Sequence, residues 1–178
     1  MRILVAITGA SGIQYGSRLV SVLNSMSGVD CRAVVSDGAK LVAKAEGVRL
    51  PKADYGEKDF LCPYASGSNP PDAMVIIPCS LKTLGEVSNG VGNSLITRAA
   101  EVTLKERKKL ILVVRDTPYS LITIRNMEKI TLAGGVVLPA CPGFYNRPKK
   151  IGDMVDFIVA RVLDQIGLKH KIGKRWKE

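Results

Sequence analysis

Polar side chains suited to binding and chemistry follow two short apolar runs in the middle of the chain. The first run, AMVII, covers residues 73–77, and a Ser-Leu-Lys-Thr segment follows at residues 80–83. The second run, LILVV, covers residues 110–114, and an Arg-Asp pair follows at residues 115–116. In open α/β sheets, ligands bind at the carboxyl ends of the strands. We therefore place the candidate site where these two runs end, within residues 78–118.

Two cations lie between these runs, on a segment that Ser94 can cap as a helix running to about Glu106. Arg98 and Lys105 are seven residues apart and so project from nearly the same side of such a helix. Glu101 stands four residues before Lys105 and could form a surface ion pair worth about 0.3 kcal/mol. The alternative is that the two cations clamp a phosphate. The spacing alone allows both interpretations.

A second segment suited to anions lies near the N-terminus. The apolar run ILVAI (residues 3–7) is followed by TGASG (residues 8–12) and then by a helical pattern. A strand, a Gly/Ser turn and a helix place free amides and the positive helix end near an anion. Ser11 could cap the helix or contact a ligand, and the turn could equally be a tight bend. Ser36, after the run CRAVV (residues 31–35), could be a cap or a ligand contact.

Several kinds of chemistry lack the residues that they need. The only histidine, His170, lies in the basic tail, so a Ser-His-Asp or Cys-His system would have no general base in the core. No Asp/Glu/His cluster has metal-ligand spacing, and no Walker lysine pattern is present. The remaining Arg, Lys, Ser, Tyr and carboxylate groups favour binding phosphorylated ligands and stabilising a departing phosphate.

The bulk properties predict a soluble single domain. The chain has 178 residues, and we assign residues 1–168 to one domain and residues 169–178 to a basic C-terminal extension. No apolar run approaches the roughly 18 residues that span a bilayer, so we expect a cytoplasmic protein with no membrane contact. The net charge of +10 would suit nucleic acid, but only 5% of residues are aromatic and no aromatic-studded basic strand is present. We therefore expect no nucleic-acid partner.

The order of elements predicts the fold that would position these groups. Short apolar runs alternate with helical patterns, and we expect strands at residues 3–7, 31–35, 73–77, 110–114 and 136–138. This alternation predicts a flavodoxin- or Rossmann-like three-layer α/β/α fold with a mostly parallel sheet. After the fourth strand, Thr117 should cap a helix that has Pro118 in its first position. On the last helix, Arg161 lies at the edge of the apolar stripe, which favours an inward role.

Seven motifs together resemble the flavin prenyltransferases of the UbiX type. They occur in that family's order with similar spacings and cover most of the chain. They are TGASG (8–12), ASGS (65–68), PCSLKTL (78–84), TRAAEVTLKER (97–107), RDTP (115–118), PGFYNRP (142–148) and RVLDQIG (161–167).

The resemblance implies a flavodoxin-like flavoprotein that binds FMN and assembles as a dodecamer. It implies transfer of a dimethylallyl group from dimethylallyl phosphate to N5 and C6 of reduced FMN, without a metal. The prenylated FMN would then serve a UbiD-type decarboxylase.

The resemblance also assigns roles to individual residues. It implies that FMN is contacted by Gly9, Ala10, Ser11, Ser36, Ser80, Leu81, Lys82, Thr83 and Arg115. It places Ser66 in the active-site wall, and it implies that the phosphate of the prenyl donor is bound by Arg98, Lys105, Tyr145 and Arg161. Glu46 matches a glutamate implicated in proton transfer, and we count Glu46, Asp116 and Ser11 as catalytic candidates. Asp116 departs from the family pattern, which usually has Glu there, so its carboxylate is one methylene shorter.

Two other functions fit parts of the sequence. Flavin-dependent decarboxylases of cysteinyl substrates resemble the PCSLKTL region, but they rely on a core histidine, and here only His170 is available. The other alternative is a non-enzymatic FMN carrier.

Overall fold

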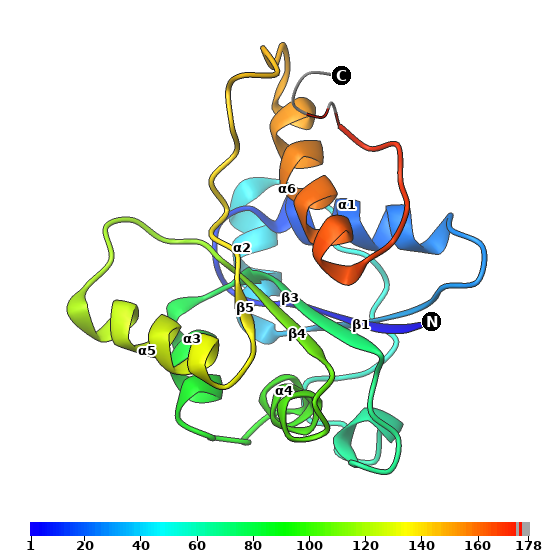
Figure 1. The fold of residues 1–178 in the computed structure, drawn as a ribbon, viewed down its shortest axis with the longest axis vertical. Coiled ribbons are helices and arrows are strands. Elements are labelled where there is room, and N and C mark those ends of the chain that lie inside the picture. The colour runs from blue at the N-terminus through cyan, green and yellow to red at the C-terminus, as the bar shows by residue number, and fades with distance from the viewer. Residues whose placement is uncertain (174, 176–178) are drawn as a thin grey trace.

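The computed structural model describes residues 1–173 and 175, whose central element is a five-stranded sheet (Figure 1). The strands are β1 (Arg2–Ile7), β2 (Asp30–Val35), β3 (Ala73–Cys79), β4 (Lys109–Val114) and β5 (Val136–Val137). All neighbouring strands pair in parallel, in the order β2-β1-β3-β4-β5. Each strand begins and ends within about two residues of the predicted apolar run, so the strand predictions are confirmed.

Helices cover both faces of the sheet. They are α1 (Ile13–Asn24), α2 (Asp37–Glu46), α3 (Leu81–Ser88), α4 (Leu95–Lys105), α5 (Leu121–Leu132) and α6 (Ile151–Ile166), with a short 3-10 turn η1 (Pro63–Ala65). Side chains of α1, α2 and α6 share one buried cluster with the sheet, and those of α3, α4 and α5 share the other. The three-layer α/β/α prediction is confirmed.

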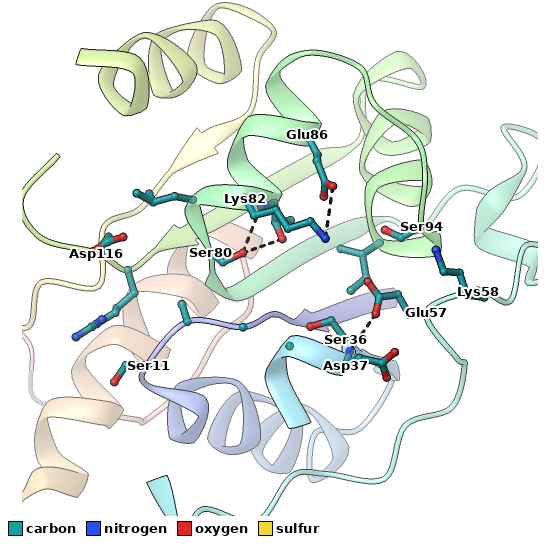
Figure 2. A pocket seen from close by; sticks show the side chains of 17 residues that line it. Ser11, Ser36, Asp37, Glu57, Lys58, Ser80, Lys82, Glu86, Ser94 and Asp116 are labelled. Atoms are coloured by element: carbon teal, nitrogen blue, oxygen red, sulfur yellow. Dashed lines mark hydrogen bonds and ion pairs between the residues drawn. The ribbon is translucent and has the colours of Figure 1, made fainter. Parts of the chain in front are cut away.

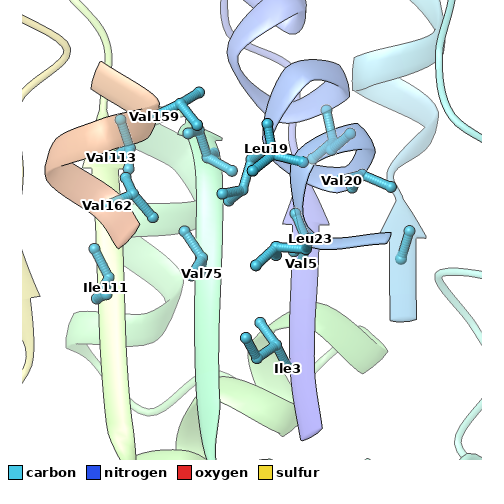
Figure 3. Close-up of a cluster of buried hydrophobic side chains, with 14 of the residues drawn as sticks. Ile3, Val5, Leu19, Val20, Leu23, Val75, Ile111, Val113, Val159 and Val162 are labelled. Atoms are coloured by element: carbon cyan, nitrogen blue, oxygen red, sulfur yellow. The ribbon is translucent and has the colours of Figure 1, made fainter. Parts of the chain in front are cut away.

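The alternation of side chains along β1 shows why the strands are continuously apolar. Ile3, Val5 and Ile7 enter the cluster under α1 and α6, as Figure 3 shows for the first two. Leu4 and Ala6 point to the opposite cluster. All five are fully buried, so a parallel strand covered on both faces needs an apolar residue at every position.

The strand order creates a crevice between β1 and β3. The chain passes from β1 to β2 on one side and then returns to form β3 on the other side of β1. The loops after β1 and β3 therefore leave the sheet in opposite directions, and such switch points are where α/β sheets bind ligands.

Serine caps define the starts of three helices on one side of this sheet. Ser80, Ser94 and Ser120 each accept a hydrogen bond from the amide three residues later, at Thr83, Thr97 and Thr123. The predicted start of the helix at Pro118 is wrong, because α5 begins at Leu121 after the Ser120 cap. The peptide bond between Thr117 and Pro118, just before this cap, is cis.

The C-terminal segment after α6 lies against the domain. Leu168 and Ile172 are partly buried against the cluster under α1 and α6, and the side chain of His170 is only 3% exposed. Residues 174 and 176–178 lie outside the described part of the chain. The division at residue 168 stays a prediction.

Candidate functional site

A cleft of about 660 Å³ lies at the carboxyl ends of β1, β3 and β4 (Figure 2). The turn after β1 contributes residues 9–11, and the start of α2 contributes residues 36–38. The start of α3 contributes residues 80–83, and Arg115 and Asp116 follow β4. The polar groups that the sequence placed after separate strands therefore meet in one cleft.

Two helix starts face this cleft. Ser36 caps α2 by accepting from the Ala39 amide at 3.0 Å, and Ser80 caps α3 by accepting from the Thr83 amide at 3.3 Å. The first amides of a helix have no partner within the helix, and the helix dipole adds partial positive charge there. Two such ends in one cleft make a site for an anion such as a phosphate monoester.

Close backbone contact holds the first of these helix ends in place. A Cβ on Gly9 would lie 2.9 Å from the carbonyl carbon of Gly38 and 3.1 Å from its Cα. Both atoms belong to the backbone at the start of α2, so only glycine allows the turn after β1 to approach this closely. The two walls of the cleft are thus in direct backbone contact.

Thr8 connects the ends of β1 and β3 beneath the cleft. Its hydroxyl donates to the Pro78 carbonyl at 2.8 Å and accepts from the Ser80 amide at 2.9 Å. The residue is 2% exposed. We did not predict this role, although a buried threonine directly after an apolar strand is a signal for it.

The charged groups of the cleft divide between its two ends (Figure 2). Asp116 lies at one end with Ser11, and Arg115 directly precedes it in the chain; Arg115 and Asp116 are both exposed. At the other end, Lys82 lies 3.6 Å from Glu86, and Glu57 accepts from the Asp37 amide at 3.0 Å. Glu57 and its neighbour Lys58 come from the loop between α2 and η1, and no motif in the sequence connected this loop with the site.

Glu46 lies at the end of α2 and holds the start of α1. Its two carboxylate oxygens accept from the amides of Gly12 and Ile13 at 2.9 and 3.2 Å. Burial raises the pKa of this carboxyl, but hydrogen bonds from Ser11 and these amides, together with the charge of Arg115, bring it below its ordinary value. The Glu46 carboxylate, and not the Ser11 side chain, therefore accepts hydrogen bonds from the amides at the start of α1, and the N-cap residue is Gly12.

The cations of α4 lie outside this cleft, beside η1. Arg98 donates from Nε to the Ala65 carbonyl at 3.1 Å and from Nη1 to Glu101 at 2.9 Å. Lys105 pairs with its neighbour Glu106, and Glu101 pairs with Arg98, so the first of the two interpretations, a pair between Glu101 and Lys105, is not what the structure has. Ser66, next to Ala65, is exposed on the same surface.

The remaining predicted residues lie in a third place, on α6 and the loop before it. The ring of Tyr145 packs edge-on against Phe157, with centroids 5.8 Å apart. Arg161 is 51% exposed and pairs with Asp164, so the predicted inward orientation is wrong. Its place beside the apolar stripe is compatible with a side chain that extends outward along the helix surface. Within one chain, the predicted FMN residues meet, but the predicted donor residues do not join them.

His170 has a structural environment away from the cleft. Its Nε2 lies 3.1 Å from Asp164, and its Nδ1 accepts from the Ile172 amide at 3.1 Å. In residues 1–173 and 175, no group of three or more His, Cys, Asp or Glu side chains could hold a metal ion. None of the helices found there is long and apolar enough to cross a membrane.

Comparison with known proteins identifies the family. The Flavoprotein family model matches residues 1–163. The flavin prenyltransferase UbiX of Methanocaldococcus jannaschii is 43% identical, over 99% of this chain and 98% of that protein. The chain belongs to the UbiX family of flavin prenyltransferases. It is a transferase, as the motif series predicted.

Solved structures give the same assignment. AnUbiX in complex with FMN and dimethylallyl pyrophosphate has a TM-score of 0.94 and 39% identity, covering 99% of this chain and 97% of that one. A dodecameric FMN-dependent UbiX-like decarboxylase from Escherichia coli O157:H7 has a TM-score of 0.93 and 37% identity, and both chains are covered completely. The peptidyl-cysteine decarboxylase EpiD, at 15% identity and a TM-score of 0.64, shares only the fold.

Proposed function

We propose that this protein joins the dimethylallyl group of dimethylallyl phosphate to N5 and C6 of reduced FMN and releases phosphate. The observation that carries the proposal is the cleft in which two capped helix starts and Arg115 meet. AnUbiX, a relative with the same fold, has been solved with FMN and a dimethylallyl donor.

The cleft suits FMN on structural grounds. Amides at the starts of α2 and α3 can hold the phosphate, with Ser36, Ser80 and Thr83 as hydroxyl partners. Gly9, Ala10, Ser11, Leu81 and Lys82 line the walls, and Arg115 supplies a cation near the opposite end. When bound, the reduced flavin supplies the nucleophilic N5 and C6 atoms. The chain's own groups bind it, orient it and limit its contact with water.

We place the prenyl phosphate on residues that neighbouring subunits bring to the cleft. The exposed Ser66 and Lys105 and the half-buried Arg98 form one group, and the exposed Tyr145 and Arg161 form another. A UbiX-like relative is dodecameric. Large apolar side chains are also exposed elsewhere on the chain, among them Leu121 at 61% and Ile122 at 73% at the start of α5 and Phe144 at 71% in the loop before α6. Exposed apolar surface of this kind supports assembly into an oligomer, for which we propose a dodecamer.

The catalytic candidates have distinct environments. Asp116 is exposed at the cleft, and its carboxylate accepts from the Thr117 amide at 2.7 Å. Glu46 is ionised at neutral pH and contacts Ser11. We propose that these groups hold and move protons as phosphate departs and C6 loses its proton.

The product's destination is also part of the proposal. A prenylated FMN made in this cleft would pass to a UbiD-type decarboxylase.

All four cysteines lie in the described part of the chain and are free thiols. Reducing compartments maintain that state, which supports activity in the cytoplasm.

A phosphate-release assay tests the proposal. The enzyme is mixed anaerobically with dimethylallyl phosphate and reduced FMN, and free phosphate is measured. Release should require reduced FMN and should fail with oxidised FMN. A parallel reaction with dimethylallyl diphosphate releases diphosphate, so inorganic pyrophosphatase is added before phosphate is measured to determine whether the enzyme accepts that donor. Release without reduced flavin would indicate a phosphatase, and no release despite bound FMN would indicate a carrier; either result would overturn the proposal.

A further inference from the structure

One carboxylate near the end of α6 binds three side chains. Asp164 Oδ2 accepts from Nη1 of Arg161 at 2.9 Å, one helical turn earlier. Its Oδ1 accepts from Nη2 of Arg175 at 2.9 Å and lies 3.1 Å from Nε2 of His170. Asp164 therefore connects a cation of the helix with two residues of the C-terminal extension.

The surroundings of Asp164 keep it charged and fixed. Its side chain is 21% exposed, and that of His170 is 3% exposed. Burial raises the pKa of the Asp164 carboxyl, but the hydrogen bonds from Arg175 and His170 bring it below its ordinary value. The Ile172 amide donates to Nδ1 of His170, so Nε2 carries the proton that is donated to Asp164. The extension thus contacts Oδ1 of the carboxylate, whereas Arg161 contacts Oδ2.

Arg161 remains able to bind an anion while it is held. A guanidinium has five N–H donors, and Asp164 engages the Nη1 group alone. The Arg161 side chain is 51% exposed, so other donors of its planar fork face solvent. A free arginine would lose about 2 kcal/mol of rotamer entropy when it binds. A carboxylate that already fixes the guanidinium lowers this cost.

We propose that Asp164 is a positioning residue for the phosphate of the prenyl donor, acting through Arg161. The extension, through His170 and Arg175, holds Asp164 in place. The inference rests on the proposed function, in which Arg161 of one subunit binds that phosphate. Asp164 has no contact with FMN in this arrangement, because it lies on α6 and outside the lining of the cleft.

The test compares two carboxylates of the same helix. Asp164→Asn removes the charge that holds Arg161. Asp156→Asn is the matched control, because Asp156 also lies on α6 and pairs with an arginine, Arg18, at 2.7 Å. We expect the KM for dimethylallyl phosphate to rise about tenfold in Asp164→Asn, on the scale of one charge-assisted hydrogen bond. The KM for FMN and kcat should stay near wild type. The thermal midpoint should fall in both variants, because each loses a carboxylate that pairs with an arginine, whereas the kinetic constants of the control should match wild type.

A double-mutant cycle shows whether Asp164 acts through Arg161. In an Arg161→Gln background, adding Asp164→Asn should leave the donor KM unchanged, since the group to be positioned is gone. A further rise in that background would overturn the inference. An unchanged KM for the donor in Asp164→Asn would also overturn the inference. A lower KM in that variant would overturn it too, because it would mean that Asp164 competes with the phosphate for Arg161. A wild-type enzyme that prenylates no flavin would overturn the proposed function and this inference with it, whereas the other results overturn the inference alone.

Discussion

Replacing Gly9 by alanine should destabilise the protein and weaken its flavin site. The new Cβ would lie 2.9 Å from the Gly38 carbonyl carbon, whereas carbon atoms prefer separations of about 3.5–4.0 Å. Both contacting segments are backbone, so the turn after β1 or the start of α2 must move by roughly 0.6 Å. Overpacking of this size costs about 1–3 kcal/mol. Because the same two segments hold the proposed phosphate site, we expect FMN to bind about tenfold more weakly.

Gly38 provides the matched control, because it forms the other side of this contact. A Cβ on Gly38 would lie 3.4 Å from Gly9 Cα, an ordinary contact, and Gly38 is in the first turn of α2. Alanine there should be neutral or stabilising by up to about 1 kcal/mol, since it favours the helix. Thermal unfolding and fluorescence titration with FMN measure both effects. If Gly9→Ala and Gly38→Ala unfold at the same temperature, the close backbone approach is not what fixes the cleft.

Three further predictions concern single polar groups. The folded-state pKa of Glu46 is lowered, so its charge stabilises the fold at pH values above the carboxyl's ordinary pKa of about 4.3, and this contribution is lost as the pH falls through the lower folded-state pKa. The difference in stability between wild type and Glu46→Gln, followed by thermal melts, should therefore shrink below a pH of about 4.3. A difference that grows on acidification would contradict the assignment. Thr8→Val should cost about 1–3 kcal/mol, because it removes the hydrogen-bond partner of the part-buried Ser80 amide. Thr103→Val should cost less, because the Thr103 hydroxyl only adds a bond to a helix carbonyl. Equal losses in thermal melts would be evidence against the bridging role of Thr8. Asp116→Asn keeps an acceptor for the Thr117 amide but removes the negative charge. The kcat should therefore fall about 10²–10⁴-fold, while the affinity for FMN stays the same. An unchanged kcat would remove Asp116 from the catalytic candidates.

The sheet and the meeting of polar groups in the cleft could be predicted because local signals determine them. Continuous apolar runs mark strands that are covered on both faces, and the polar residues just after each run come together when the strands are parallel. The start of α5 was mispredicted because Thr117 and Pro118 resemble a helix start, while the cap is Ser120. The same Ser-x-x-Thr spacing begins α3 and α4, and it was the better signal.

Features that depend on contacts across the chain were harder to predict. Glu57 and Lys58 reach the cleft from an irregular loop, and Thr8 acts through a strand 70 residues away. The helical stripe suggested that Arg161 points inward, but Asp164 and the C-terminal extension hold it at the surface. Its direct partner, Asp164, lies only three residues on, but Asp164 is itself held by His170 and Arg175. Arg175 lies 14 residues beyond Arg161, outside the range of a helical pattern.

The central claim is tested most directly by the mass of the flavin after an anaerobic incubation. The enzyme is incubated with reduced FMN and dimethylallyl phosphate, denatured, and the released flavin is analysed by mass spectrometry. A flavin heavier than FMN by one prenyl unit, absent when the donor is omitted, is the result that we predict. Unmodified FMN recovered from enzyme that binds both FMN and the donor would contradict the assignment of this cleft to flavin prenylation.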